Sequence, residues 1–200
     1  MSNPPQDTLP EIEIVKRWLK AKLVGVMNVQ ACFLTRGNTL VVTTWTGVIV
    51  NIYLLDEAVK TRTIKRILQE SGDVGVGSLF IVKRALLPDE RERADIKEWL
   101  LAVHEVTRER VYTYALYDDE PKLGQAHFEP IGSTGDFVAR HGPSINFEQF
   151  RCYRMSVKAR FIKGDWYVAD FGLSNFWHDP HKTHYQPNYR RPDTPPSTTW

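Results

Sequence analysis

The chain has 200 residues, of which 42% are hydrophobic and 25% charged, and this composition is typical of a globular protein. The chain has 26 basic and 24 acidic residues, so its net charge is only +2. No overall electrostatic field would therefore draw it to nucleic acid or to a membrane surface. The two cysteines could pair, but they imply no disulfide framework, and free buried thiols are expected. No apolar run approaches the roughly 18 residues of a membrane span. With no apolar leader at the N-terminus, we expect a cytoplasmic protein.

Proline content and hydrophobic periodicity predict three regions. Residues 1–10 contain three prolines and predict a flexible arm. Residues 11–177 predict a single α+β domain. Residues 178–200 contain five prolines and almost no aliphatic side chains, which predicts an extended or disordered tail.

The first part of the domain predicts a helix followed by a three-stranded meander. Apolar side chains recur at helical spacing between Glu11 and Ala21. Two strands, 29–35 and 39–44, flank the turn-like tripeptide at 36–38, and a run rich in β-branched residues at 48–54 predicts the third strand.

A second helix is predicted from Glu57 to Ser71, with Asp56 as its N-cap and Gly72 at its end. Its apolar side chains occupy one side, and basic side chains at i, i+3 and i+4 share the other. We name this second group the helix basic face; it consists of Arg62, Lys65 and Arg66.

The remaining elements alternate between strands and a third helix. They are strands at 75–83, 111–117, 125–131 and 137–140, and a helix at 94–108. The whole order predicts the α+β class, with a mixed or mainly antiparallel sheet, about three helices and a closing C-terminal β-hairpin.

That hairpin is predicted over Arg151 to Gly172, where apolar and polar residues alternate with the period of a strand. Gly164 and Asp165 form a two-residue motif typical of a type II′ turn. Tyr153, Met155, Val157, Ala159 and Phe161 are expected to face the core, together with Trp99, Phe80 and Ile67 from other elements. The opposite side is the hairpin basic face, which consists of Arg154, Lys158 and Arg160.

The two basic faces predict a non-catalytic binding or scaffold module, whose partner is an acidic protein surface or the phosphates of a nucleic acid. Binding to nucleic acid would be weak and strongly salt-dependent, because it would rest on counterion release. Few exposed aromatic residues interleave these positions, so we expect no base stacking. No cofactor or metal is expected.

The alternative is a metal-dependent hydrolase. The order helix, meander, helix, strand, helix, strand resembles the core of restriction-endonuclease-like nucleases, and this resemblance implies a metal held by carboxylates. The candidate residues are Asp56, Asp118, Asp119 and His127. The sequence departs from the expected pattern, because the predicted strands between 39 and 54 contain no acidic residue.

Three shorter motifs have simpler explanations. Residues 169–174 resemble the Asp-Phe-Gly segment of protein kinases, but no His-Arg-Asp catalytic loop precedes them, so we predict a structural role for Asp170 at a strand end. The glycines at 72–77 follow a helix and precede a strand, which predicts a helix stop rather than a phosphate loop. The histidines at 178–184 are expected in a solvated tail, and His104 is expected to be packed or half-buried.

Overall fold

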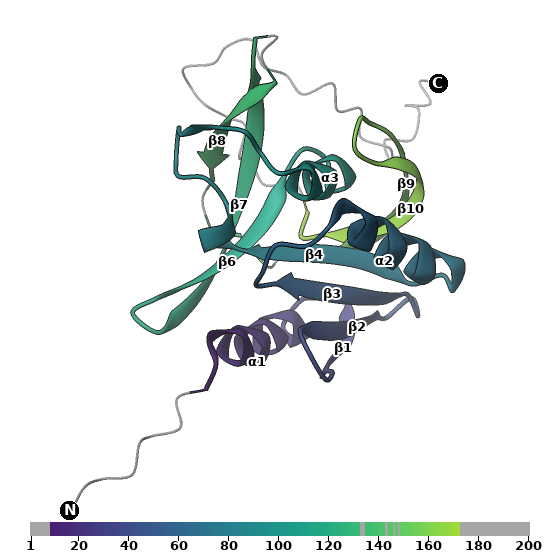
Figure 1. The fold of residues 1–200 in the computed structure, drawn as a ribbon. Helices are drawn as coiled ribbons and strands as arrows, with labels where there is room; N and C mark the ends of the chain where they lie inside the picture. The colour runs from purple at the N-terminus through teal and green to yellow at the C-terminus, as the bar shows by residue number, and fades with distance from the viewer. Residues whose placement is uncertain (1–8, 133–134, 143, 146, 148, 173–200) are drawn as a thin grey trace, which may run out of the picture.

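The structure is a computed structural model and describes residues 9–132, 135–142, 144–145, 147 and 149–172. Within these residues, three α-helices, one short 3-10 helix and ten strands form an α+β domain with one open, mixed sheet, as predicted (Figure 1). The tail at 178–200, its histidines and nearly all of the arm at 1–10 lie outside the described residues. No helix in the described ranges is long and apolar enough to cross a membrane.

The N-terminal half follows the predicted order closely. Its elements are α1 (Glu11–Val24), β1 (Val29–Leu34), β2 (Thr39–Thr44), β3 (Ile49–Leu55), α2 (Thr61–Asp73) and β4 (Gly77–Lys83). The first three strands form the predicted antiparallel meander, with Val42 opposite Val50. Helix α2 carries the chain back, so β4 pairs with β3 in the parallel direction.

The C-terminal half adds one more α-helix and six strands. Its elements are η1 (Arg84–Leu86), β5 (Arg93–Ala94), α3 (Glu98–Val106), β6 (Val111–Tyr117), β7 (Glu120–Ile131), β8 (Asp136–His141), β9 (Arg151–Lys158) and β10 (Lys163–Asp170). The predicted helix at 94–108 is therefore too long, because Ala94 belongs to β5 and pairs with Phe137 of β8.

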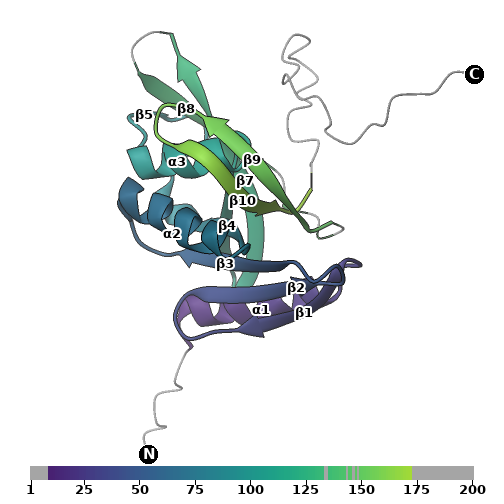
Figure 2. The same cartoon turned by 90° about the vertical axis from the view of Figure 1, so that its right-hand side faces the viewer.

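The sheet forks at β4 (Figures 1 and 2). Strand β10 pairs with the beginning of β4 at Ser78, whereas β6 pairs with its end from Ile81 to Lys83. One branch continues from β6 through β7 and β8 to β5, and the other ends with β9. Strands β6 and β10 therefore diverge on the same side of β4, and the space between them must be filled by side chains.

Two hydrophobic clusters cover opposite faces of the central sheet. Along β4, Leu79 and Ile81 belong to the cluster under α1, whereas Phe80 and Val82 belong to the cluster with α2 and α3. All four are buried, as expected for a strand covered on both faces. The expected core group is confirmed: it lies in this second cluster, with Trp99, Phe80 and Val157 buried and Ile67 and Phe161 partly buried.

Two details of the second helix differ from the prediction. Asp56 is not its N-cap, because α2 begins at Thr61, after Lys60; instead, Asp56 Oδ1 accepts a hydrogen bond from Asn38 Nδ2 at 2.9 Å. The helix ends at Asp73, two residues later than predicted, and Gly75 has a φ of +72° before β4 begins. The glycine run is therefore a helix stop, as predicted.

The predicted hairpin turn at Gly164 and Asp165 is wrong. The strands turn at 159–162, and Gly164 lies within β10 opposite Val157. The observed turn buries Ile162 completely and lets Glu105 of α3 accept its backbone N–H at 3.0 Å. Gly164 serves packing instead, because a Cβ there would lie 2.4 Å from the Trp166 ring.

Candidate functional site: an arginine-lined pocket

The two basic faces are both exposed but are less purely basic than the sequence suggests. All of Arg62, Lys65, Arg66, Arg154, Lys158 and Arg160 are exposed. On α2, Arg66 lies 3.8 Å from Glu70. On the hairpin, Asp165 lies opposite Ser156, so an acid from β10 stands within the hairpin basic face. Neither face by itself forms a concentrated cationic site.

A more concentrated cationic site lies at the beginning of β9. A cavity of about 430 Å³ separates this part of β9 from the turn between β2 and β3. Its lining residues are Asn28, Thr44, Trp45, Thr46, Val48, Arg108, Phe150, Arg151, Cys152, Tyr153 and Arg154. Three of these residues are arginines and none is acidic. We call this cavity the arginine pocket.

Arg108 reaches the pocket from an unusual backbone position. It follows α3 with a φ of +57°, and the N–H of Glu109 returns to the carbonyl of His104 at 2.8 Å. This is a helix ending at which glycine is usual, since a left-handed backbone is costly for other residues. The Arg108 guanidinium carbon lies 4.0 Å from the centroid of the Tyr153 ring, a distance typical of a cation–π contact.

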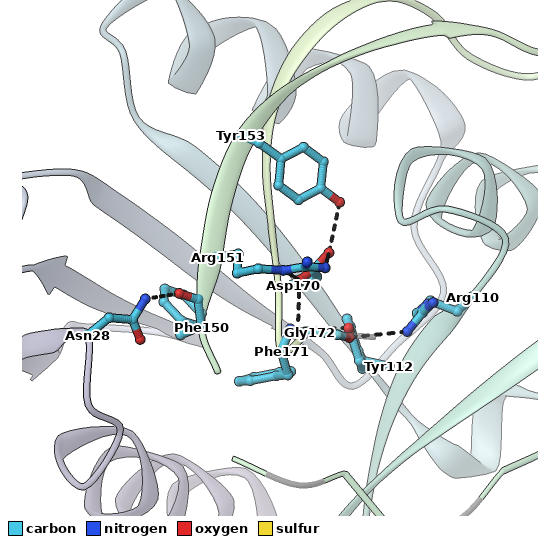
Figure 3. Close-up of polar contacts among 9 residues, drawn as sticks. All are labelled: Asn28, Arg110, Tyr112, Phe150, Arg151, Tyr153, Asp170, Phe171 and Gly172. Atoms are coloured by element: carbon cyan, nitrogen blue, oxygen red, sulfur yellow. Dashed lines mark hydrogen bonds and ion pairs between the residues drawn. The ribbon is translucent and has the colours of Figure 1, made fainter. Parts of the chain in front are cut away.

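The opposite wall is a well-braced turn that carries an exposed indole. Trp45 is 68% exposed, although it is a large aromatic residue. Its backbone N–H donates to the carbonyl of Asn28 at 3.2 Å, and the next turn is closed by Gly47, which has a φ of +80°. The Asn28 side chain in turn donates to the carbonyl of Phe150, so the turn is tied to the beginning of β9 (Figure 3).

The third arginine, Arg151, is held in place by an ion pair with Asp170 (Figure 3). The Asp170 carboxylate accepts two bonds from the Arg151 guanidinium, at 2.9 and 3.0 Å. It also accepts one bond from the Tyr153 hydroxyl at 2.9 Å and one from the Gly172 N–H at 2.8 Å. Asp170 is only 4% exposed and ends β10, so it has the structural role predicted for it.

The residues that follow Asp170 connect the end of β10 with β6, the strand on the other branch of the forked sheet. The Phe171 N–H donates to the hydroxyl of Tyr112 on β6 at 3.2 Å, and buried Arg110 approaches the Gly172 carbonyl at 3.4 Å. Burial, together with the nearby Asp170 charge, raises the pKa of Tyr112 to about 12, so its hydroxyl remains protonated at neutral pH. These contacts tie the end of β10 to β6.

The pocket offers cations and aromatic rings rather than an activated nucleophile. Burial, aided by the charge of Asp170, raises the pKa of the Cys152 thiol to about 11, so little reactive thiolate exists at neutral pH. The same two causes, burial first, raise the pKa of Tyr153. This arrangement is suited to binding an anion rather than to covalent chemistry.

The candidate hydrolase residues lie at different places in the fold. Asp56 follows β3, and Asp118 and Asp119 form the exposed tight turn between β6 and β7. His127 is buried on β7, where its Nδ1 lies 2.9 Å from Nε2 of His104 and 2.6 Å from the carbonyl of Glu109. Across the described part of the chain, no group of three or more His, Cys, Asp and Glu side chains is placed to hold a metal.

His104 is buried, in agreement with the expectation of a packed histidine. Burial and the neighbouring His127 lower its pKa well below the usual value, and its Nε2 accepts the Phe128 N–H at 3.2 Å. A neutral imidazole is required at this position, because a protonated Nε2 could not accept that bond.

Of the pocket residues, sequence reasoning finds Arg154 but misses Arg108, Arg151 and Trp45. A signal for Trp45 exists: Leu40, Val42 and Thr44 are the inward positions of β2, so the next residue should point outward. For Arg108 we find no comparable local signal. No protein-family model, curated protein or solved structure matches this chain, so the site is interpreted from its own geometry.

Proposed function

We propose that this protein is a non-catalytic binding module that holds an anionic partner in the arginine pocket. The observation that carries the proposal is the pocket lining, which has three arginines and no acidic residue. Guanidinium groups pair with phosphates and carboxylates through two parallel hydrogen bonds, so a cluster of them suits either type of partner.

The three arginines contribute differently to the potential in the pocket. The charge of Arg151 is partly offset by Asp170, which at the same time fixes the direction of its guanidinium group. Arg108 and Arg154 lie against the rings of Tyr153 and Tyr167, at 4.0 and 5.0 Å. Stacked guanidinium groups are oriented before a ligand arrives, which reduces the entropy lost on binding.

Arg154 also lies beside the end of α2. It lines a second hollow of about 180 Å³ together with Gln69, Gly72 and Asp73 of that helix and with Asp165 of β10. Figure 2 shows α2 beside the β9–β10 hairpin. A partner seated in the pocket could therefore extend across Arg154 toward α2, so the exposed basic residues would add long-range attraction to a local site.

The test is a titration with two probes, a labelled single-stranded oligonucleotide and polyglutamate, at low and at moderate salt. The wild type should bind at least one probe, with an affinity that falls steeply as salt rises. Arg154→Glu should weaken binding at least tenfold, whereas Arg17→Glu, a matched reversal at an exposed site on α1, should have little effect. Failure of the wild type to bind either probe at low salt would contradict the proposal, as would normal binding by Arg154→Glu.

Arg108→Gly separates binding from stability. Glycine accepts the left-handed backbone at this position, which should recover about 1 kcal/mol, and loss of the contact with Tyr153 should cost about the same amount. The variant should therefore keep nearly the wild-type free energy of unfolding but bind the probe less tightly. Wild-type affinity in Arg108→Gly would mean that this arginine does not contact the partner.

A further inference from the structure

The exposed indole of Trp45 is the feature of the pocket that an acidic partner alone does not explain. A carboxylate-bearing surface needs cations, but it gains little from a flat apolar ring beside them. An aromatic face next to arginines is instead the arrangement that stacks a nucleic-acid base while the cations hold its phosphate. Trp45 is 68% exposed and shares the pocket with Arg108, Arg151 and Arg154.

We propose that the arginine pocket holds one nucleotide of a single-stranded nucleic acid, with the base stacked on Trp45 and the adjoining phosphate bound by Arg108 and Arg154. This inference rests on the proposed function and names its ligand. It replaces the expectation, drawn from the sequence, that no base would be stacked, because exposed Trp45 lies in the pocket beside the arginines. The three side chains come from the turn after β2, the turn after α3 and the beginning of β9, so they approach the ligand from separate elements.

The size and shape of the pocket favour a single strand over a duplex. A cavity of about 430 Å³ lies within the range of roughly 300–1,000 Å³ seen for small-molecule sites, and it can enclose one nucleotide unit rather than a helix. In a duplex the base faces are hidden in the stack, so Trp45 would have no partner. A single strand has free base faces and can bend into a cavity.

The surface beyond the pocket is suited to the rest of the strand. Strand β9 pairs with β10 alone, so its other edge is not covered by a neighbouring strand of the described sheet. Arg154 and Lys158 are four residues apart in β9, so both side chains lie on its exposed side. The sugar–phosphate backbone would thus continue from Arg154 along the hairpin, where Asp165 weakens the attraction locally.

The experiment compares four probes at low salt: oligodeoxythymidylate, a duplex of the same length, polyglutamate and thymidine monophosphate. We expect the single strand to bind most tightly and to quench tryptophan fluorescence. Trp45→Ala should weaken its binding about tenfold, Trp45→Phe should restore part of the loss, and neither should change binding of polyglutamate. Phe33→Ala is the matched control, because Phe33 is 56% exposed on β1, outside the pocket.

The outcomes for this inference differ from those for the proposed function. If the probes bind in an arginine-dependent manner but Trp45→Ala binds the single strand as well as the wild type, base stacking is refuted and the anion pocket remains. Equal or tighter binding of duplex or polyglutamate would refute the preference for a single strand. Mononucleotide binding as tight as that of the oligonucleotide would show that a free nucleotide, rather than a strand, is held. If no probe binds, the proposed function itself fails.

Discussion

Asp170→Asn is the sharpest test of the anchor behind the pocket. The change keeps the size of the side chain but removes its charge and replaces one acceptor oxygen with a donor amide. In the native protein, the two carboxylate oxygens accept four bonds, from Arg151, Tyr153 and the Gly172 N–H. An asparagine can accept at one oxygen only, so the donors at the other position lose their partner and face an N–H group.

The magnitude follows from those contacts. A hydrogen bond to a charged group contributes about 1.5–3 kcal/mol, and the substitution disrupts two of the four. The Arg151 side chain is 35% exposed, so water can replace part of what it loses. We therefore expect the free energy of unfolding to fall by about 3 kcal/mol, a large share of the roughly 5–15 kcal/mol that holds a domain together.

Equilibrium unfolding in urea, followed by tryptophan fluorescence and by circular dichroism, measures this change. Asp165→Asn is the matched control, since it makes the same chemical change at an exposed position of the same strand and should alter stability by less than about 0.5 kcal/mol. A loss under about 1 kcal/mol for Asp170→Asn would show that the cluster in Figure 3 is not a structural anchor.

Two further predictions concern the core. The pKa of His104 is lowered in the folded state, so as the pH falls the unfolded chain binds a proton at this residue before the folded chain does. The contribution of neutral His104 to the free energy of unfolding is therefore fully present above about pH 6.5. Below that pH it should fall by up to about 1.4 kcal/mol per pH unit. His104→Gln should flatten this dependence in unfolding experiments between pH 7 and 5, and an unchanged slope would assign it to other groups. In the hairpin turn, Ile162→Ala should cost about 2–5 kcal/mol because Ile162 is fully buried, whereas Phe161→Ala should cost less than the 3–5 kcal/mol of a buried phenylalanine because it is only partly buried. A larger loss of stability for Phe161→Ala than for Ile162→Ala, in thermal or urea unfolding, would contradict the observed turn and favour the one predicted at Gly164.

Local patterns in the sequence predict most of the secondary structure. The bounds of β2 and β6 agree with the prediction, and the alternation in β9 places Val157 in the core and Arg154 on the surface. These features depend on the two-residue period of a strand, which is a property of neighbouring residues. The predicted turn at Gly164 fails for a related reason: glycine allows either a tight turn or close packing, and only the position of Trp166 shows which one is used.

The sequence by itself therefore determined the α+β class and the element order. The tertiary structure alone decided where the candidate site lies. Arg108, Trp45 and Arg154 are far apart along the chain, and they meet because the β2–β3 turn is tied to the beginning of β9 while a left-handed helix ending directs Arg108 to Tyr153. Periodicity reports which side of an element a residue occupies, but the packing of elements decides which residues from different elements face one another.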